Sequence, residues 1–194
     1  MRAAILEAES LLAIHEIEPD AITKPDQVLL EVRSCTVCAT DLKWYTGIRA
    51  HPVPSRFGHE VAGVVSAVGS DATRWRPGDR VFSRSVNGGF ADYCLADAAM
   101  LAPLPNSVGF EEGAIAQLLP IAVSAAEKSI RPGDTVYVSG AGAAGLLVTQ
   151  VARAYGEVRL TPLLTHVRPL AAIQQAFAYC LEHRAELIKM AIVP

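Results

Sequence analysis

Two short runs of this sequence carry side chains that can do chemistry together. Cys38 and Asp41 stand in the run Cys-Ala-Thr-Asp, and His59 and Glu60 follow a glycine further along the chain. A thiolate and an imidazole are ligands that Zn²⁺ prefers, and a catalytic zinc needs only three protein ligands beside an open position for water or substrate. A lone cysteine or histidine is more often a packed side chain, so the prediction of a zinc site rests on the combination.

A glycine-rich run forms the second group with chemical meaning. Gly140, Gly142 and Gly145 follow the β-branched run 135–139, which predicts a buried strand, and precede the stretch 146–155, which has helical spacing. Such glycines allow a tight turn and let a pyrophosphate approach the N-terminus of the helix, so the run predicts dinucleotide binding. A plain strand-to-helix turn built of small residues is the alternative.

The sequence beyond these glycines does not continue as a dinucleotide-binding domain should. Such a domain needs an acidic residue about 20 positions beyond the first glycine, and then further strand-helix units of about 30 residues each. At that distance the run 159–161 is Arg-Leu-Thr, with no acid. Binding of NAD(P) is therefore expected to be weakened or absent.

The elements that must position these groups form a β-rich first part and a mixed second part. Apolar runs separated by Gly and Pro turns predict short strands at residues 3–6, 28–32, 61–68, 80–83 and 90–95. Their length and spacing suggest a compact, partly open barrel and exclude a parallel α/β arrangement there. Helices are predicted over 107–128, interrupted at Pro120, and over 169–184, followed by a closing strand over 187–193. The predicted fold class is thus mixed α+β.

Composition and charge limit the partners. The 194 residues are 51% hydrophobic, with a formal net charge of −3 and no cluster of Lys and Arg, so neither nucleic acid nor an anionic membrane is expected as a partner. The first apolar run is too short for a signal peptide, and the longest, 113–126, falls short of the roughly 20 residues that cross a bilayer. We therefore expect a cytoplasmic protein that acts on a small-molecule substrate.

The cysteines fit a reducing compartment. Cys35, Cys38, Cys94 and Cys180 are few and irregularly spaced, which favours free thiols over a disulfide framework. Cys35 and Cys38 form a C-x-x-C pair. A redox motif of this kind belongs to a thioredoxin-like unit in which the pair opens a helix, whereas here the predicted strand end is followed by Thr-Asp. A redox role is the less favoured alternative.

The order and spacing of several motifs resemble those of the GroES-like catalytic domain of medium-chain, zinc-dependent alcohol dehydrogenases. The matching motifs are C-x-T-D at 38–41, G-H-E-V-A-G-V-V at 58–65, V-G at 68–69, P-G-D-R-V at 77–81 and G-G-F-A-D-Y at 88–93. The resemblance continues through E-E-G-A at 111–114, the glycine run, and L-T-H-x-x-P-L at 164–170. It implies a GroES-like barrel joined to a dinucleotide-binding, or Rossmann, domain.

The resemblance also implies a role for each residue of the first group. Cys38 and His59 match catalytic zinc ligands, and Thr40 matches the hydroxyl that hydrogen-bonds the substrate oxygen and passes its proton. Asp41 matches a carboxylate that orients a ligand. Glu60 matches an acid beside the zinc that can itself coordinate the metal.

This sequence departs from the family in three places. The third zinc ligand of the family falls on Gln117, a neutral and poorer ligand, so either Gln117 or Glu60 is expected to complete the site. The cysteine-rich loop that holds a structural zinc in many relatives is absent between Phe82 and Gly88, so one catalytic zinc and no structural zinc is expected. Residues 156–166 resemble the segment that follows a completed Rossmann domain, which indicates that most of that domain is missing.

The predicted organisation therefore has three parts. These are a GroES-like catalytic domain over 1–130, a truncated Rossmann remnant over 131–160, and a C-terminal helix and strand over 161–194 that return to the catalytic domain. The strand 135–139 would then lack neighbours on at least one side. Because an apolar strand edge invites pairing with another chain, a homodimer through this strand is expected.

Three functions are compatible with these patterns. The first is an alcohol dehydrogenase-like oxidoreductase that acts on a small alcohol or carbonyl, with NAD(P)-dependent hydride transfer impaired by the missing cofactor domain. The second is a non-redox zinc lyase, hydratase or isomerase that uses the same metal site to polarise a carbonyl or activate water. The third is a catalytically silent binding protein or a shortened chain, which the neutral Gln117 favours.

Overall fold

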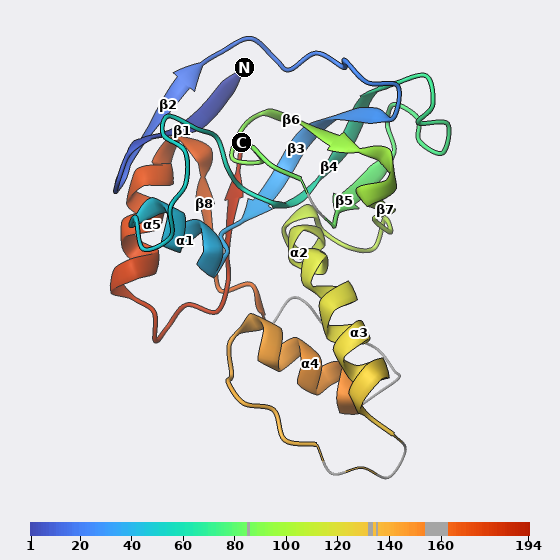
Figure 1. Ribbon diagram of the computed structural model, residues 1–194, viewed down its shortest axis with the longest axis vertical. Coiled ribbons are helices and arrows are strands. Elements are labelled where there is room, and N and C mark those ends of the chain that lie inside the picture. Colours follow the sequence, from blue (N-terminus) through green and yellow to red (C-terminus); the bar gives the residue numbers. More distant parts are fainter. Residues whose placement is uncertain (85, 132–133, 135, 154–162) are drawn as a thin grey trace.

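The computed structural model describes residues 1–84, 86–131, 134, 136–153 and 163–194 (Figure 1). This part of the chain forms a seven-stranded sheet, a separate two-stranded hairpin and five α-helices. The strands are β1 (Arg2–Ala8), β2 (Leu11–Glu16), β3 (Gln27–Thr36), β4 (Glu60–Val68), β5 (Arg80–Ser83), β6 (Tyr93–Asp97), β7 (Leu101–Pro103), β8 (His166–Pro169) and β9 (Met190–Val193).

The large sheet is open and does not close into a full barrel. Its strands pair in the order β7-β5-β4-β3-β9-β8, and β6 pairs with β3. Among the strands of the described residues, only the pair β8–β9 is parallel. Register shifts between β3 and β4, at Leu29–Leu30 and Val32–Ser34, mark bulges that increase the local twist and help the sheet to curl.

Strand β3 lies at the centre because its sequence suits a buried position. Val28, Leu30 and Val32 are at most 2% exposed, and the side chains between them are half-buried. This period of two is what a strand with one face on the core requires. The end of the strand, 34–36, is buried throughout, where β9 joins it from the C-terminal part of the chain.

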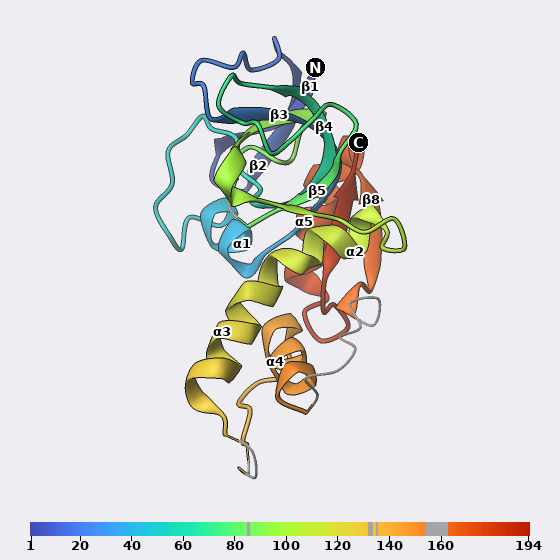
Figure 2. The same cartoon turned by 90° about the vertical axis from the view of Figure 1, so that its right-hand side faces the viewer.

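The helices fall into two groups. Helices α3 (Leu119–Ser129) and α4 (Ala143–Arg153) pack on each other beyond one end of the sheet (Figures 1 and 2). Helix α2 (Phe110–Ile115) leads into α3 through a 3-10 turn over 116–118. Pro120 lies in the first turn of α3, where a missing N–H costs nothing. The helices are α1 (Ala39–Tyr45), α2 (Phe110–Ile115), α3 (Leu119–Ser129), α4 (Ala143–Arg153) and α5 (Ile173–Glu182). A small apolar cluster of its own holds α3 and α4 together: Ile115, Ala122, Ala126, Leu147, Val151 and Leu163.

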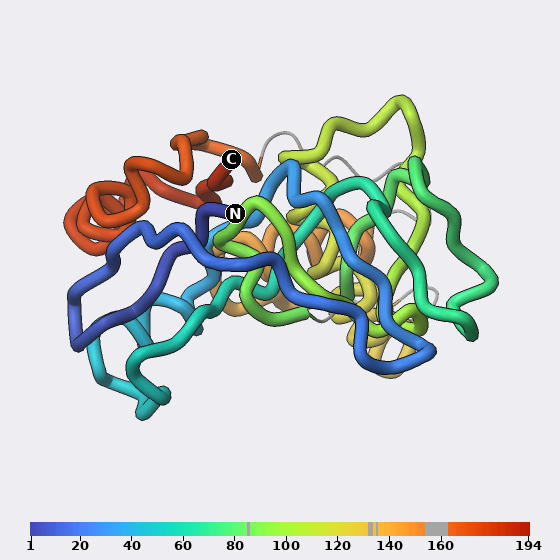
Figure 3. Tube along the Cα trace, turned by 90° about the horizontal axis from the view of Figure 1, so that it is seen from above, coloured from blue at the N-terminus to red at the C-terminus, as the bar shows by residue number. Residues whose placement is uncertain are grey.

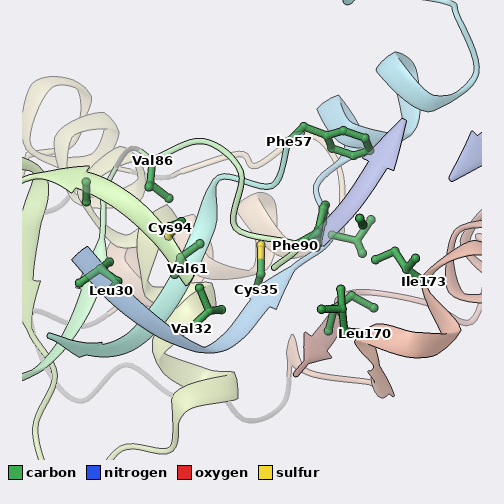
Figure 4. Packing of buried hydrophobic residues seen from close by; sticks show 14 of the residues in the cluster. Leu30, Val32, Cys35, Phe57, Val61, Val86, Phe90, Cys94, Leu170 and Ile173 are labelled. Carbon is green, nitrogen blue, oxygen red and sulfur yellow. The ribbon is translucent and has the colours of Figure 1, made fainter. Parts of the chain in front are cut away.

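The C-terminal helix α5 belongs to the main core. Phe177 contacts Phe57 and Phe90 edge to face, with ring centroids 5.7 and 5.6 Å apart. Figure 4 shows Phe57 and Phe90 in the cluster that also holds the strand residues Leu30 and Val61. Figure 3 shows the two chain ends close together, and Arg2 and Pro194 line one shallow pocket. The buried face of α5 repeats at helical spacing and consists of Ile173, Ala176, Phe177 and Cys180.

Most predicted elements are present, and the predicted fold class is confirmed. All five strands expected in the first part are found, and the expected helices correspond to α2–α3, α4 and α5. Strand β9 is shorter than the predicted 187–193, beginning at Met190. The hairpin strand β2, the short strand β7, the strand β8 and the helix α1 were not predicted.

The strand predicted over 135–139 is wrong for the residues that can be described. Residues 136–139 are not in a strand, Val136 is 40% exposed and Tyr137 is 90% exposed. A strand is stable only when its backbone groups pair with a neighbour, and no strand of the described ranges pairs with this segment. Thr135, the run 159–161 and the expected junction near 155–157 lie outside the described residues.

Among the described residues, every helix falls short of the length and apolar character that a bilayer-spanning segment needs.

Candidate metal centre

Cys38 lies at the junction between β3 and α1. It is the N-cap residue of α1, with an extended backbone. Its backbone N–H donates a hydrogen bond of 2.7 Å to Oδ2 of Asp41, the third residue of the helix. This reciprocal arrangement between an N-cap and the residue at position N3 stabilises a helix start. The C-x-T-D motif therefore turns the chain sharply out of the sheet and leaves the Cys38 side chain at the turn.

His59 and Glu60 are placed by the glycine before them. Gly58 has φ +101°, and a Cβ atom there would lie 2.8 Å from the backbone nitrogen of Phe90. Only glycine meets both constraints, since other residues rarely adopt that φ. Glu60 then opens β4 opposite Thr36 at the end of β3. The G-H-E motif thus brings His59 and Glu60 to the same end of the sheet as Cys38.

The structure brings Cys38, His59 and Glu60 together. One potential ligand atom from each lies within 4.8 Å of the other two, a span close to what one coordination sphere bridges. Glu60 is completely buried, the His59 side chain is 23% exposed, and Cys38 is partly buried. A thiolate, an imidazole and a carboxylate are a donor set that fits Zn²⁺.

Asp41 faces the ring of His59 from inside the protein. Its Oδ1 lies 3.3 Å from His59 Nδ1, and Asp41 is completely buried. The two atoms have no hydrogen bond of good geometry within the described part of the chain. The contact therefore orients the imidazole with Nδ1 toward the carboxylate, which leaves Nε2 for a metal. The orienting role that the resemblance implies for Asp41 stays a prediction, and this contact is the geometry that such a role needs.

The charges of this group shift its proton affinities. Burial disfavours the imidazolium of His59, but the neighbouring Asp41 and Cys38 outweigh burial and raise the pKa of His59 to about 10. Burial also raises the pKa of Asp41, and the contact with His59 offsets part of that rise. A metal that binds through this imidazole must therefore displace the proton that the raised pKa favours, so metal binding releases a proton.

Glu60 is held by a lysine that the sequence analysis missed. Lys189 is 5% exposed, and its Nζ lies 2.8 Å from Glu60 Oε1 and 2.6 Å from Oε2. The hydroxyl of Thr36 donates a hydrogen bond to the same Oε2. A signal for this partner does exist in the sequence. Lys189 stands within the apolar run 187–193, and a charge in a buried strand needs an opposite charge nearby.

One cavity of about 560 Å³ joins the candidate metal ligands to the glycine run. Cys38 and Glu60 line one end of it, and Leu118 lines it from the turn between α2 and α3. The cavity is also lined by Gly140, Gly142, Gly145 and Lys189. The two groups that the sequence singled out therefore face the same space.

The glycine run forms a tight turn before α4. Gly140 has φ +99°, and a Cβ atom on Gly145 would lie 1.9 Å from the carbonyl oxygen of Gly140. A Cβ atom on Gly142 would meet no atom within 4 Å. Gly145 is therefore needed for the close approach of the helix to the turn, whereas the space beside Gly142 is open.

The remaining predicted residues lie around the site with different surroundings. Thr40 is half-buried in the first turn of α1. The side-chain nitrogen of Gln117 donates a 3.1 Å hydrogen bond to the carbonyl oxygen of Arg84, so its amide has a protein partner. Trp44 packs edge-on to His59, with ring centroids 6.1 Å apart, and stacks on His51 at 4.4 Å. Trp44 thus forms an aromatic wall next to the candidate metal ligands.

Known proteins with similar sequences identify the family of this chain. The family described as "Alcohol dehydrogenase GroES-like domain" matches residues 24–129. The chain is 37% identical over 142 residues to quinone oxidoreductase of Homo sapiens, covering 70% of this chain and 43% of that protein. It is 28% identical over 193 residues to (R,R)-butanediol dehydrogenase of Bacillus subtilis (strain 168), covering 80% and 56%.

A solved structure shows the same relationship. A protein of Sinorhizobium meliloti 1021, solved bound to NADP, superposes with a TM-score of 0.71 at 25% identity, covering 78% of this chain and 52% of that one. The chain spans about half the length of the curated relatives it matches. The match to the GroES-like domain, together with the similarity to these relatives, places the chain in the medium-chain dehydrogenase/reductase family.

Proposed function

We propose that this chain carries the metal site of a zinc-dependent, alcohol dehydrogenase-like oxidoreductase that acts on a small alcohol or carbonyl. The observation that supports the proposal most is the convergence of Cys38, His59 and Glu60 within 4.8 Å at the end of a cavity that also reaches the glycine run. The names of relatives, a quinone oxidoreductase and a butanediol dehydrogenase, point to the same reaction class.

In this proposal, Cys38 and His59 hold the zinc, and Glu60 or Gln117 completes its coordination. A bound zinc would supply Lewis acidity, which polarises a carbonyl or lowers the pKa of an alcohol. Asp41 keeps the imidazole of His59 in one orientation. Thr40, two positions after Cys38, supplies a hydroxyl that hydrogen-bonds the substrate oxygen and takes or returns its proton.

Hydride transfer to or from NAD(P) has less support from the sequence than zinc binding has. The turn at Gly140, Gly142 and Gly145 opens α4 beside the cavity, which suits a pyrophosphate. However, the sequence has no acid at 159–161 to hold the adenosine ribose, and residues 156–166 resemble the segment that follows a completed Rossmann domain. We therefore expect weak nicotinamide binding.

A non-redox zinc lyase, hydratase or isomerase is the second candidate. The feature that favours it is the proton-carrying network of Thr36, Glu60 and Lys189, with Glu60 and Lys189 lining the cavity beside Cys38. Such chemistry needs a metal and an acid–base group but no nucleotide. The third candidate, a catalytically silent binding protein, is supported by the hydrogen bond that engages the amide of Gln117.

Two measurements distinguish these candidates: the zinc content of the purified protein, and fluorescence titration with NADH and NADPH. Zinc with nicotinamide binding supports the oxidoreductase, zinc without it supports the non-redox enzyme, and neither supports a silent protein. His59→Gln should lose the zinc because it removes a ligand. His183→Gln is the matched control, since His183 stacks on Tyr179 in α5 with ring centroids 4.0 Å apart and should leave zinc content unchanged. Equal zinc content in both variants would contradict the site.

A further inference from the structure

The carboxylate of Glu60 is shared between the candidate metal site and Lys189. Both of its oxygens lie within 2.8 Å of the Lys189 ammonium, and Oε2 also accepts a hydrogen bond from Thr36. The same carboxylate supplies an oxygen to the cluster with Cys38 and His59. Since Glu60 is completely buried and Lys189 is 5% exposed, water screens little of this interaction.

The backbone around Lys189 is fixed by a neighbouring segment of the chain. Its carbonyl oxygen accepts hydrogen bonds from the backbone N–H of Thr165, at 3.0 Å, and of His166, at 3.2 Å. The hydroxyl of Thr165 donates to the same carbonyl oxygen at 3.0 Å. Lys189 directly precedes β9, which pairs with β3 next to Thr36. The pairing of β9 with β3, together with these hydrogen bonds, therefore holds the Lys189 ammonium next to Glu60.

The lysine changes what Glu60 can offer a metal. A free carboxylate beside the Cys38 thiolate and the His59 imidazole would bring a second negative charge to a divalent cation. Paired with Lys189, Glu60 brings almost none, because the ammonium compensates it at hydrogen-bond distance. A metal bound here would keep a more positive charge, and its tightest anionic contact would be Cys38.

We propose that Lys189 is a positioning residue that competes with the metal for the carboxylate of Glu60, and so keeps the centre weakly ligated and electrophilic. The inference rests on the proposed zinc site. It predicts the direction in which metal affinity changes: removing the Lys189 ammonium frees Glu60 to ligate the metal, so the protein binds the metal more tightly. If the pair merely kept Glu60 in place as a ligand, its loss would weaken metal binding instead.

The test compares wild type, Lys189→Met, Lys189→Arg and the double variant Glu60→Gln/Lys189→Met. Zinc affinity is measured by competition with a chromophoric chelator, and the coordination sphere by the visible absorption spectrum after loading with Co²⁺. Lys189→Met should bind zinc at least about tenfold more tightly, the lower end of what changes in outer partners of metal ligands produce. Its cobalt spectrum should differ from that of wild type.

The other variants show whether the gain passes through Glu60. Lys189→Arg keeps the positive charge and should retain the wild-type affinity and spectrum. Glu60→Gln/Lys189→Met removes the carboxylate as well and should show no gain. Lys189→Met leaves a buried unpaired carboxylate, which destabilises the metal-free protein, so its thermal midpoint should be lower than that of wild type without zinc and should rise more when zinc is added.

The outcomes separate this inference from the proposed function. If wild type takes up neither zinc nor Co²⁺, the zinc site itself is wrong and the inference is overturned with it. If wild type binds metal and Lys189→Met binds it equally or more weakly, only the role of Lys189 is overturned. Failure of Lys189→Met to fold with zinc present would count in the same way, because the metal would then not have replaced the lysine charge.

Discussion

At the scale of single residues, burial separates the four cysteines into two kinds. Cys38 is partly exposed beside His59, whereas Cys35, Cys94 and Cys180 are buried thiols in the core. The buried thiols are small apolar side chains in effect, and their ionisation is opposed by the apolar surroundings. Cys35 therefore packs in the core, while Cys38 remains the candidate metal ligand of the C-x-x-C pair.

Because the thiol of Cys94 is buried, we expect the folded protein to lose stability at alkaline pH. Burial raises its pKa to about 12, well above the usual value of a thiol, which the unfolded chain retains. Above that usual value the unfolded state loses the proton and the folded state keeps it, so the free energy of unfolding falls by up to about 1.4 kcal/mol per pH unit. Cys94→Ala should therefore show a shallower decline between about pH 9 and 11 in urea titrations followed by circular dichroism.

The control is a substitution that shortens a buried side chain but removes no ionisable group. Val65→Ala also removes buried atoms from the sheet, since Val65 is 1% exposed, but it removes no ionisable group. It should lower stability equally at every pH. Parallel pH curves for wild type and Cys94→Ala would show that Cys94 does not ionise on unfolding in this range.

At the scale of elements, turns at the ends of strands carry the site. Cys38 is the N-cap of α1, and Gly58 lets β4 begin with Glu60. The turn before α4 lines the same cavity as Cys38 and Glu60. Each turn depends on a glycine or a cap whose chemistry is local. The strands between them set the distances, because β3 pairs with both β4 and β9 at its C-terminal end.

The glycine run offers a test of how tightly α4 packs against its turn. Gly145→Ala places a Cβ atom 1.9 Å from the carbonyl oxygen of Gly140, so the turn must move. We expect α4 to become less stable by about 1–3 kcal/mol, the usual cost of overpacking. Hydrogen exchange of the α4 amides measures this directly. Gly142→Ala meets no atom within 4 Å and should cost less than about 1 kcal/mol, the value of a poorer helix cap. Equal protection in both variants would contradict the close packing at Gly145.

At the scale of the whole molecule, the two helices α3 and α4 form a small lobe beside a well-built β domain. Of the residues that the structure describes, six buried ones hold this lobe, whereas the main core extends through both sheets, α1 and α5. Val136 and Tyr137 lie in the segment between α3 and α4 and are 40% and 90% exposed. These exposed side chains lie where the predicted dimer would bring a second chain.

A homodimer through the segment 135–139 stays a prediction, although the described residues 136–139 form no strand. Tyr137→Asp should shift the protein from dimer to monomer in light scattering at high concentration, because it places a charge in the expected interface. Ile48→Asp is the matched control, since Ile48 is 75% exposed in the loop after α1 and should leave the assembly unchanged. A wild-type protein that is monomeric at every concentration would contradict the dimer.

Much of the fold and the members of the candidate site could be read from the sequence, because the signals are local. Alternation in β3 predicted a strand, glycines and prolines predicted the turns, and the C-x-T-D and G-H-E motifs named Cys38, His59 and Glu60 as partners for a metal. What the sequence by itself determined is therefore most of the strands and helices, and the chemistry of the residues at their ends.

Only the tertiary structure decided which distant groups meet. Lys189 lies 129 positions from Glu60, and their pairing follows from the way β9 joins β3. The segment 136–139 has strand-forming residues but no strand, since a strand exists only where another strand offers its backbone. Such outcomes depend on contacts between elements far apart in the chain, and local sequence patterns do not encode them.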